Sequence, residues 1–313
     1  MEIKSAALIG LGAMGVFFAP RMEAYLGRED FFVIAEGERK KRLETVGVTI
    51  NEVNYRFPIV EPKTENRVVD LLIMAVKDSG LDQAIKDIES FVGEKTQILC
   101  VMNGVESEEK VAAAYGWEHV LYSYMKMSVV MKNGVANFDP HWGYVHFGEA
   151  DNRNYSERTS VIADFFKACD IPFIIDEDMV KGLWFKFMCN VGENMTCALL
   201  EIPFGAYRYS EHANLIRKNA MREVIRIAQK KGIRLGEEDI EFQEKDVMRI
   251  PFQNRPSTLQ DLEAGRRTEV TMFAGAVVKM GERLGIETPL NWMFYHAIKV
   301  KEEKNEGMFD EPS

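Results

Sequence analysis

The sequence predicts an α/β domain over residues 1–176, followed by an all-helical domain over residues 177–313. Three observations support this fold class. Short β-rich runs alternate with helical patterns in the first half, as is typical of βαβ units and a parallel sheet. After Asp176 nearly every segment has helical periodicity. A glycine-rich turn from Gly10 to Gly15 joins the first apolar run directly to a helical pattern. The chain is also long enough for two domains with sizeable cores.

Each expected element has a local reason. Strands are expected over residues 3–9, 31–35, 68–76, 97–102, 121–130, 135–147 and 172–175, and helices over 80–91, 155–168, 211–231 and 270–284. The run 68–76 is apolar almost throughout, which indicates a strand buried on both faces. Asn133-Gly134 is typical of a tight hairpin turn. The tail from Glu302 is polar, and we expect it to fray.

Composition excludes several classes of protein. The net charge of −10 argues against a nucleic-acid partner, because phosphate neutralisation requires clustered Lys and Arg. No apolar run approaches the roughly 20 residues that span a membrane, and no secretory signal precedes the first strand. The four cysteines, Cys100, Cys169, Cys189 and Cys197, form no CxxC pair and no cluster with His. We therefore expect a cytoplasmic protein with reduced, buried thiols and no metal site.

The most informative motif is the glycine turn at the end of the first strand. It comprises Gly10, Leu11, Gly12, Ala13, Met14 and Gly15. Gly10 permits the tight turn, Gly12 lets the backbone approach a ligand's phosphates, and Gly15 lets the helix pack closely on the strand. A pyrophosphate then lies at the helix N-terminus, where free N–H groups and the helix dipole favour anions. This context predicts a Rossmann-like dinucleotide-binding domain, with a plain strand-to-helix turn as the alternative.

The end of the second strand is expected to contact the adenosine ribose of such a cofactor. Glu36 lies 21 residues beyond Gly15, close to the distance at which an acid binds the ribose hydroxyls of NAD. Arg39, Lys40 and Arg42 follow within two helical turns and could instead clasp the 2′-phosphate of NADP. A solvated helix start with mixed charges is a further interpretation. The residues therefore indicate NADP or NAD without deciding between them.

Two further strand ends carry polar residues. Lys77 follows the run 68–76, and Asn103 with Gly104 follows the run 97–102. Ligands of open α/β sheets bind outside the carboxyl ends of the strands, so Lys77 and Asn103 are candidates for the cofactor site. A surface cap for the lysine and a simple turn for Asn-Gly are the alternatives.

A second candidate site opens the helical domain. Lys186, Asn190 and Asn194 are spaced four apart, so they share one face of a helix. Their neighbours Leu183, Trp184, Phe187, Met188 and Val191 are all apolar. A lysine and two amides within so apolar a helix are costly unless they meet a ligand or each other. The alternative is an exposed polar stripe.

Ser257 and Glu269 are candidates near the end of the chain. Ser257 is expected to cap a helix, with Gln260 at the reciprocal position of a capping box. Glu269 precedes an apolar helix. In one straight helix Ser257 and Glu269 would lie roughly 18 Å apart, so they could serve one small substrate only if the chain bends; Gly265 is the candidate break. Plain capping and a first-turn acid are the alternatives.

In the order and spacing of these pieces, the chain resembles the ketopantoate reductase (2-dehydropantoate 2-reductase) family along essentially its whole length. The matching pieces are the glycine turn, Lys77, Asn103-Gly104, Trp184 to Lys186 with Asn190 and Asn194, and the segment from Ser257 to Glu269. The resemblance implies hydride transfer from NADPH or NADH to the ketone of ketopantoate. The product is pantoate, for pantothenate and coenzyme A synthesis.

The resemblance also implies roles for individual residues. Lys186 would be the general acid that protonates the developing alkoxide, and Glu269 would orient it and hydrogen-bond a substrate hydroxyl. Asn190 and Asn194 would hold the substrate's other hydroxyl, and Ser257 its carboxylate.

The remaining family positions complete an expected cleft between the domains. Asn103, and with it Lys77, would lie where the nicotinamide meets the substrate. The expected partner is thus a small 2-oxo acid, and the resemblance leaves a homodimer open.

Three features depart from the family's pattern. Met195 follows the second asparagine where members commonly have Pro, which would change how that helix breaks. Glu36 stands where many members carry an Arg for the NADP phosphate, so the resemblance favours NADPH and Glu36 favours NADH. Such reductases also have many paralogues, so another branched 2-oxo acid is an alternative substrate.

The sequence also allows two alternative functions. Dehydrogenases of the 3-hydroxyacid and 6-phosphogluconate type also open with GLGxMG and use a Lys with an Asn four residues later. Ser257 with Glu269, and Asn103 with its glycine, favour the reductase instead. A non-catalytic dinucleotide sensor is the rival from another class, but such a protein would be expected to lose Lys186 or Glu269.

Overall fold

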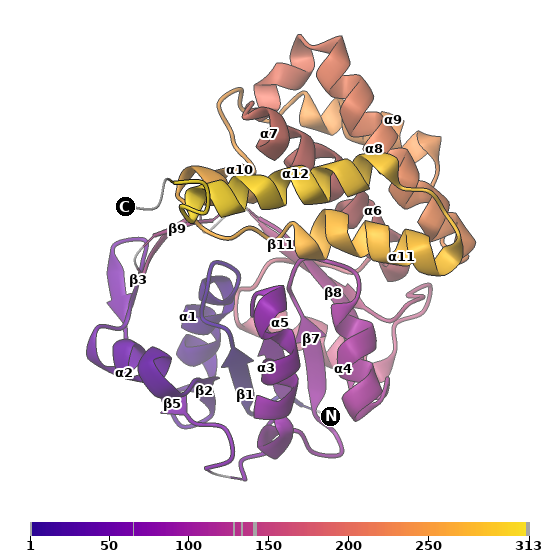
Figure 1. Cartoon of the computed structure of the whole chain (residues 1–313). Coiled ribbons are helices and arrows are strands. Elements are labelled where there is room, and N and C mark those ends of the chain that lie inside the picture. The colour runs from indigo at the N-terminus through magenta and orange to yellow at the C-terminus, as the bar shows by residue number, and fades with distance from the viewer. Residues whose placement is uncertain (1, 65, 128, 133, 140–142, 311–313) are drawn as a thin grey trace. The chain divides into compact units, whose positions relative to one another are not determined.

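The computed structural model describes residues 2–64, 66–127, 129–132, 134–139 and 143–310. The chain divides into two compact units, Met1–Val180 and Lys181–Ser313 (Figure 1). The first unit holds every strand among the described residues, and the second is helical. The mixed α/β fold class is therefore as predicted. The assignment of cofactor binding to residues 1–176 and of substrate binding to residues 177–313 stays a prediction.

The main sheet of the first unit is mostly parallel. Its order is β12-β11-β8-β7-β6-β1-β2-β5. The strands are β1 (Ala6–Ile9), β2 (Phe31–Ile34), β5 (Ile59–Val60), β6 (Leu71–Met74), β7 (Gln97–Cys100), β8 (Val120–Lys126), β11 (Tyr144–Gly148) and β12 (Phe173–Ile174). The pairs from β8 to β5 are all parallel, and β11 runs antiparallel to β8. The parallel strands meet with their carboxyl ends at one edge, where the candidate cofactor residues follow.

Helices cover both faces of this sheet, which explains its near-continuous apolar strands. They are α1 (Gly15–Leu26), α2 (Gly37–Thr45), α3 (Leu81–Asp87), α4 (Ser107–Tyr115) and α5 (Glu157–Ala168). Leu8 of β1 belongs to a core cluster with Phe17 of α1 and Phe166 of α5. Its neighbour Ile9 belongs to a separate cluster with Leu81 of α3. Successive β1 residues thus bury their side chains in two cores, one on each face of the sheet.

Several elements of the first unit differ from the predicted bounds. The strand predicted over 68–76 is only β6, and Val68 outside it is 58% exposed. The helix predicted over 80–91 is α3 flanked by 3₁₀ turns. A second sheet, in the order β4-β3-β10-β9, was predicted only in its hairpin. Its strands are β3 (Val48–Ile50), β4 (Val53–Tyr55), β9 (Val130–Lys132) and β10 (Val135–Asn137).

The predicted hairpin joins β9 and β10. Lys132 pairs with Val135 in an antiparallel register. Gly134 lies in the turn with φ +81°, a conformation that favours glycine. Asn133 lies outside the described residues.

The second unit is built from helices (Figure 1). They are α6 (Met179–Cys189), α7 (Met195–Leu200), α8 (Glu211–Lys230), α9 (Glu237–Val247), α10 (Ser257–Glu263), α11 (Ala276–Leu284) and α12 (Pro289–Asn305). Two π-helical turns, η3 (Asn190–Asn194) and η5 (Thr271–Gly275), interrupt the regular pattern. Phe187 of α6, Phe273 of η5 and Phe294 of α12 are fully buried.

The fraying predicted from Glu302 is wrong. Helix α12 continues to Asn305, and Glu302 is only 5% exposed. Its Oε1 accepts hydrogen bonds from the backbone N–H and the hydroxyl of Thr268, at 2.7 and 2.6 Å. Lys299 Nζ donates to its Oε2 at 2.8 Å. A polar residue that reads as a solvated tail is therefore an anchor for the chain before η5.

Two other sequence observations have structural counterparts. Cys100, Cys169, Cys189 and Cys197 are all buried and form no disulfide, as predicted. Within the described ranges, no helix has the length and apolar character needed to cross a membrane.

Candidate functional site

The glycine turn between β1 and α1 is packed so tightly that two of its glycines are obligatory. Gly10 has φ +98°, and a Cβ there would lie 2.5 Å from the carbonyl carbon and oxygen of Ala75. A Cβ on Gly15 would lie 2.2 Å from the carbonyl oxygen of Gly10. No side chain fits at either position without moving backbone atoms. The packing roles predicted for Gly10 and Gly15 are therefore met by this geometry.

The middle of the same turn is open. A Cβ on Gly12 would meet no atom within 4 Å. The Gly12 N–H donates to the Gly10 carbonyl at 2.9 Å, and its carbonyl accepts from Val16 at 3.0 Å. Leu11 is buried, whereas Ala13 and Met14 are partly exposed. The protein leaves space beside Gly12, which suits the close approach of a ligand to the backbone at the start of α1.

Lys77 and Asn103 lie on one side of this turn, at the same edge of the sheet. β1 lies between β2, which follows it through α1, and β6, so the strand order reverses there. Such reversal points are where open α/β sheets bind ligands. Lys77 follows β6 and is exposed, and Asn103 follows β7 and is half-buried. Because β1, β6 and β7 are adjacent parallel strands, the three strand ends are neighbours.

The charged segment after β2 contains two arginines without carboxylate partners. Lys40 Nζ lies 3.2 Å from Glu61, and Lys41 Nζ lies 2.7 Å from Glu38. Among the described residues, neither Arg39 nor Arg42 has an ion-pair partner. Partial desolvation, and then the like charge of Arg42, lower the pKa of Arg39. The two guanidinium groups, three residues apart on α2, form an exposed cationic pair.

Glu36 lies directly before that helix. It is exposed and occupies the N-cap position of α2 in an extended conformation. Its carbonyl accepts the backbone N–H of Lys40 at 3.1 Å, and its side chain forms no capping hydrogen bond. The Glu36 carboxylate thus takes no part in capping the helix.

Lys186, Asn190 and Asn194 lie at the end of α6 and in the π turn η3. Lys186 and Asn190 are half-buried, and Asn194 is only 8% exposed. Asn194 Nδ2 lies 3.5 Å from Asn190 Oδ1, so the two amides face each other. The alternative of an exposed polar stripe does not fit this burial.

The helix around these residues differs from the expected one. The chain does not break after Asn194 but continues through Met195 into α7. Instead of a break, η3 inserts a π turn, a device often found at functional sites. The spacing of four residues therefore spans a wider turn than the α-helix assumed from the sequence.

The capping role predicted for Ser257 is wrong. Pro256 occupies the N-cap position of α10, and no side chain caps the helix. Gln260 donates its amide to the carbonyl of Arg255 at 2.7 Å instead of closing a capping box. Ser257 is exposed at the first position of α10. Its hydroxyl is thus not committed to holding the helix.

The predicted break at Gly265 is present. Helix α10 ends at Glu263, and Gly265 has φ +66°, in the left-handed region. Glu269 is half-buried, and its carbonyl accepts the backbone N–H groups of Met272 and Phe273 at 3.0 and 3.1 Å. The preceding residue, Thr268, donates its backbone N–H and its hydroxyl to Glu302. Glu269 therefore stands on backbone that is fixed from both sides.

Sequence reasoning missed a buried carboxylate inside the candidate site. Glu193, in η3, is 4% exposed, and Arg217 of α8 is fully buried. Arg217 Nη1 lies 3.0 Å from Glu193 Oε1. Burial raises the pKa of Glu193, and Arg217 opposes that rise. The signal available in the sequence was a lone Glu in the apolar run between Asn190 and Asn194.

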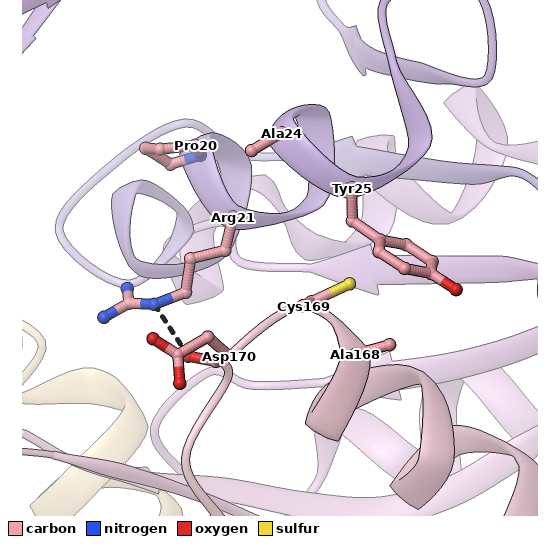
Figure 2. Close-up of a pocket in the computed structure, with 7 residues that line it drawn as sticks. All are labelled: Pro20, Arg21, Ala24, Tyr25, Ala168, Cys169 and Asp170. Carbon is pink, nitrogen blue, oxygen red and sulfur yellow. Dashed lines mark hydrogen bonds between the residues drawn. The ribbon is translucent and has the colours of Figure 1, made fainter.

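A surface pocket of the first unit lies away from these residues. It has a volume of about 400 Å³ and is lined by Pro20, Arg21, Ala24, Tyr25, Ala168, Cys169 and Asp170. Figure 2 shows Arg21 reaching from α1 to the backbone of Asp170, where Nε donates to the carbonyl at 3.1 Å. None of the candidate residues lines this pocket, so it belongs to the packing of α1 against α5.

Comparison with known families matches both halves of the chain. A family model described as "Ketopantoate reductase PanE/ApbA" matches residues 6–152. A second, "Ketopantoate reductase PanE/ApbA C terminal", matches residues 178–302. The two matches take in nearly all the candidate residues above.

Individual proteins agree with the family matches. A 2-dehydropantoate 2-reductase of Streptococcus pyogenes serotype M3 is 28% identical over 252 residues, covering 80% of this chain and 82% of the relative. A ternary structure of D-mandelate dehydrogenase with NADH and anilino(oxo)acetate has a TM-score of 0.85 at 20% identity, covering 96% of this chain and 99% of the other. A PanE/ApbA family ketopantoate reductase from Ralstonia eutropha JMP134 has a TM-score of 0.80 at 20% identity, with the same coverage. These structural likenesses concern the fold.

Proposed function

The chain belongs to the ketopantoate reductase family, and we propose that it reduces ketopantoate to pantoate with NADPH. As a member of this family it is an oxidoreductase acting on CH–OH groups. The observation that carries the substrate proposal is the group formed by Lys186, Asn190 and Asn194. Asn190 and Asn194 face each other, Lys186 lies one helical turn before Asn190, and all three are partly or fully buried on one largely apolar helical segment.

The proposed chemistry assigns a separate task to each residue. A bound nicotinamide dinucleotide supplies the hydride that reduces the keto carbon. The Lys186 ammonium donates a proton to the oxygen that becomes the alcohol, and it stabilises the negative charge that develops there. Glu269 orients Lys186 and, once the ketone is reduced, accepts a hydrogen bond from the hydroxyl that has formed there. One hydride and one proton are thus added across the carbonyl, and the reaction balances.

The other polar residues are proposed to bind the substrate. The mutual bond of the two asparagines uses Asn194 Nδ2 and Asn190 Oδ1. Asn190 Nδ2 and Asn194 Oδ1 are outside that bond, and they offer a donor and an acceptor to one hydroxyl group. The exposed hydroxyl of Ser257 is proposed to bind the carboxylate, and Asn103 to bind where the substrate meets the cofactor.

The cationic pair on α2 supports NADPH over NADH. Arg39 and Arg42 are exposed and lie close together, whereas the two lysines between them are ion-paired. Arginines suit phosphate recognition because their guanidinium groups offer bidentate hydrogen bonds. Glu36 opposes this preference. The glycine turn and Lys77 are proposed to bind the parts that both dinucleotides share.

Exchange of charges around α2 tests the cofactor proposal. Replacing both arginines (Arg39→Ala with Arg42→Ala) should raise the KM for NADPH about tenfold or more, because charge-assisted bonds to the phosphate are lost. The KM for NADH should change less than about twofold. Glu36→Arg should shift preference further toward NADPH. Equal losses for both dinucleotides in the arginine variant would contradict the assignment.

The substrate proposal is tested by following cofactor oxidation with ketopantoate, with NADPH and NADH in parallel assays. We expect turnover with ketopantoate and a higher kcat/KM with NADPH. Reduction of other 2-oxo acids in preference to ketopantoate would contradict the substrate. A phenyl-substituted 2-oxo acid belongs in the panel because of the structural likeness to D-mandelate dehydrogenase. A parallel assay of 3-hydroxy acid oxidation with NAD(P) tests the alternative that the protein is a dehydrogenase of the 3-hydroxyacid type.

Two broader expectations stay predictions. They are the cytoplasmic location and the homodimer. Cofactor binding without turnover of any 2-oxo acid would instead favour the dinucleotide-sensing alternative.

A further inference from the structure

A buried ion pair lies next to the proposed substrate residues. Arg217 is 0% exposed and Glu193 is 4% exposed, and their side chains meet at 3.0 Å. Removing two charges from water is costly, and a well-packed apolar pair is often at least as stable. A contribution to stability is therefore a weak explanation for this pair. Because Glu193 lies between Asn190 and Asn194 in η3, a role in the site is the stronger explanation.

Glu193 is held from three elements of the second unit. Arg217 of α8 donates to Oε1, and Gln243 of α9 donates to Oε1 at 3.0 Å and to Oε2 at 3.1 Å. The hydroxyl of Tyr207, from η4 (Phe204–Arg208), donates to the Glu193 backbone carbonyl at 2.9 Å. Both carboxylate oxygens and the carbonyl are thus occupied. This fixes the orientation of the residue and of its peptide group.

The fixed residue lies within the π turn that carries the two asparagines. Glu193 immediately precedes Asn194 and follows Asn190 by three positions. Its other neighbour, Gly192, allows close contact with α8, since a Cβ there would lie 2.9 Å from the Arg217 carbonyl oxygen. Arg217 therefore holds the turn through its side chain, and its backbone packs closely against Gly192. The paired amides of Asn190 and Asn194 depend on that wider turn.

We infer that Glu193, clamped by Arg217 and Gln243, is a positioning residue that sets the π turn so that Asn190 and Asn194 together bind a substrate hydroxyl. This inference rests on the proposed function and deepens it. It assigns the protein's selectivity for a 2-oxo acid with a distal hydroxyl group to an ion pair that touches no substrate. The clamp should therefore affect the choice between hydroxylated and unhydroxylated substrates.

The test compares ketopantoate with 3,3-dimethyl-2-oxobutanoate, which lacks only the distal hydroxyl. The ratio of the two kcat/KM values measures hydroxyl recognition. Glu193→Gln should lower this ratio about tenfold, mainly through a higher KM for ketopantoate, because a misplaced amide pair forfeits its bonds to the hydroxyl. The dissociation constant of NADPH should not change.

A matched control removes a different ion pair of α8, one that does not involve the π turn. Glu237 of α9 lies 2.7 Å from Arg222 of α8, and both side chains are largely exposed. Glu237→Gln makes the same chemical change away from the π turn. We expect it to leave the substrate ratio at the wild-type value.

A second variant separates positioning from plain stability. Glu193→Leu combined with Arg217→Met removes the pair without leaving a buried charge, so it should fold even where Glu193→Gln does not. If the ion pair only stabilises the fold, this variant should regain both the wild-type Tm and the wild-type substrate ratio. If the pair positions the asparagines, the variant should regain the Tm but keep a substrate ratio about tenfold below wild type.

The results separate failure of the proposed reductase function from failure of the positioning role of Glu193. Wild-type protein that reduces neither acid overturns the proposed function, and this inference with it. Active wild-type protein with a ratio near one overturns the hydroxyl site and this inference, and leaves the reductase activity standing. A wild-type ratio in both Glu193 variants overturns the clamp and leaves the proposed function standing.

Discussion

The two units provide candidate functional groups in different ways. The glycine turn of the first unit offers backbone, and its shape follows from the absence of side chains at Gly10 and Gly15. The α6–η3 segment of the second unit offers side chains, and a buried ion pair ties its Glu193 to Arg217 of another helix. Local spacing is enough to specify the first arrangement. The second requires partners distant in sequence.

The largest expected effect is on the chemistry assigned to the second unit. Lys186→Ala should lower kcat by roughly 10²–10⁴-fold, the range that a positioned general acid contributes. Lys181→Ala is the matched control, because Lys181 lies on the same helix and forms an ion pair with Asp239 at 3.1 Å. Steady-state turnover of the two variants gives the comparison. Normal turnover of Lys186→Ala would remove this lysine from the mechanism.

The backbone of the first unit should be sensitive at one glycine and tolerant at another. Gly15→Ala forces a Cβ to 2.2 Å from the Gly10 carbonyl oxygen, so it should destabilise the fold by at least about 3 kcal/mol. Gly12→Ala meets no atom within 4 Å and should change stability by less than about 1 kcal/mol. Urea denaturation measures both. Equal losses would mean that the turn is not packed as described.

Two buried carboxylates sharpen the comparison between the units. Glu108 of α4 is 1% exposed and accepts hydrogen bonds from the Ser107 hydroxyl and the Ser123 N–H, at 2.9 and 3.4 Å. Burial raises its pKa from 4.5 to about 7. Glu193, in the other unit, has the Arg217 guanidinium as its partner. We expect the fold to be most stable when the Glu108 carboxyl is protonated. Glu193, in contrast, is stabilised by its ion pair with Arg217.

The sign of the pH effect at Glu108 follows from this raised pKa. Between about pH 4.5 and 7 the folded chain binds more protons than the unfolded chain, so the free energy of unfolding should fall as pH rises. The fall should be at most about 3 kcal/mol. Glu108→Gln should remove its share of the fall and leave the share of Glu193, whose pKa burial also raises to about 7; Glu109→Gln, at the exposed neighbouring position, should remove none. Unfolding curves at pH 5 and pH 8 test this, and an unchanged slope in Glu108→Gln would contradict it.

The same contrast explains what the sequence could predict. Gly10 and Gly15 were recognisable because a strand, a turn and a helix impose fixed spacing on adjacent residues. Helical spacing likewise grouped Lys186 with Asn190 and Asn194. The π turn, in contrast, is accompanied by contacts from Arg217 and Gln243, which lie tens of residues away. No local pattern announces such partners.

The errors have the same origin. Ser257 matched a capping box, but Pro256 occupies the cap position and Gln260 bonds to Arg255. Glu302 looked like part of a solvated tail, but it is buried by its bonds to Thr268. In each case a tertiary contact overrode a local preference. The short strands β3, β4 and β5 also escaped prediction, because strands of two or three residues carry too little periodicity.

The division of tasks between the two units can be measured directly by titrating NADPH into Gly12→Ala and Lys186→Ala. A methyl group at Gly12 occupies space that the protein leaves open for the cofactor, so Gly12→Ala should raise the dissociation constant at least about tenfold while the protein stays folded. Lys186→Ala should bind NADPH with the wild-type constant and yet lose turnover. Wild-type cofactor affinity in folded Gly12→Ala, or lost affinity in Lys186→Ala, would contradict the assignment of cofactor to the glycine turn and of proton transfer to the helical unit.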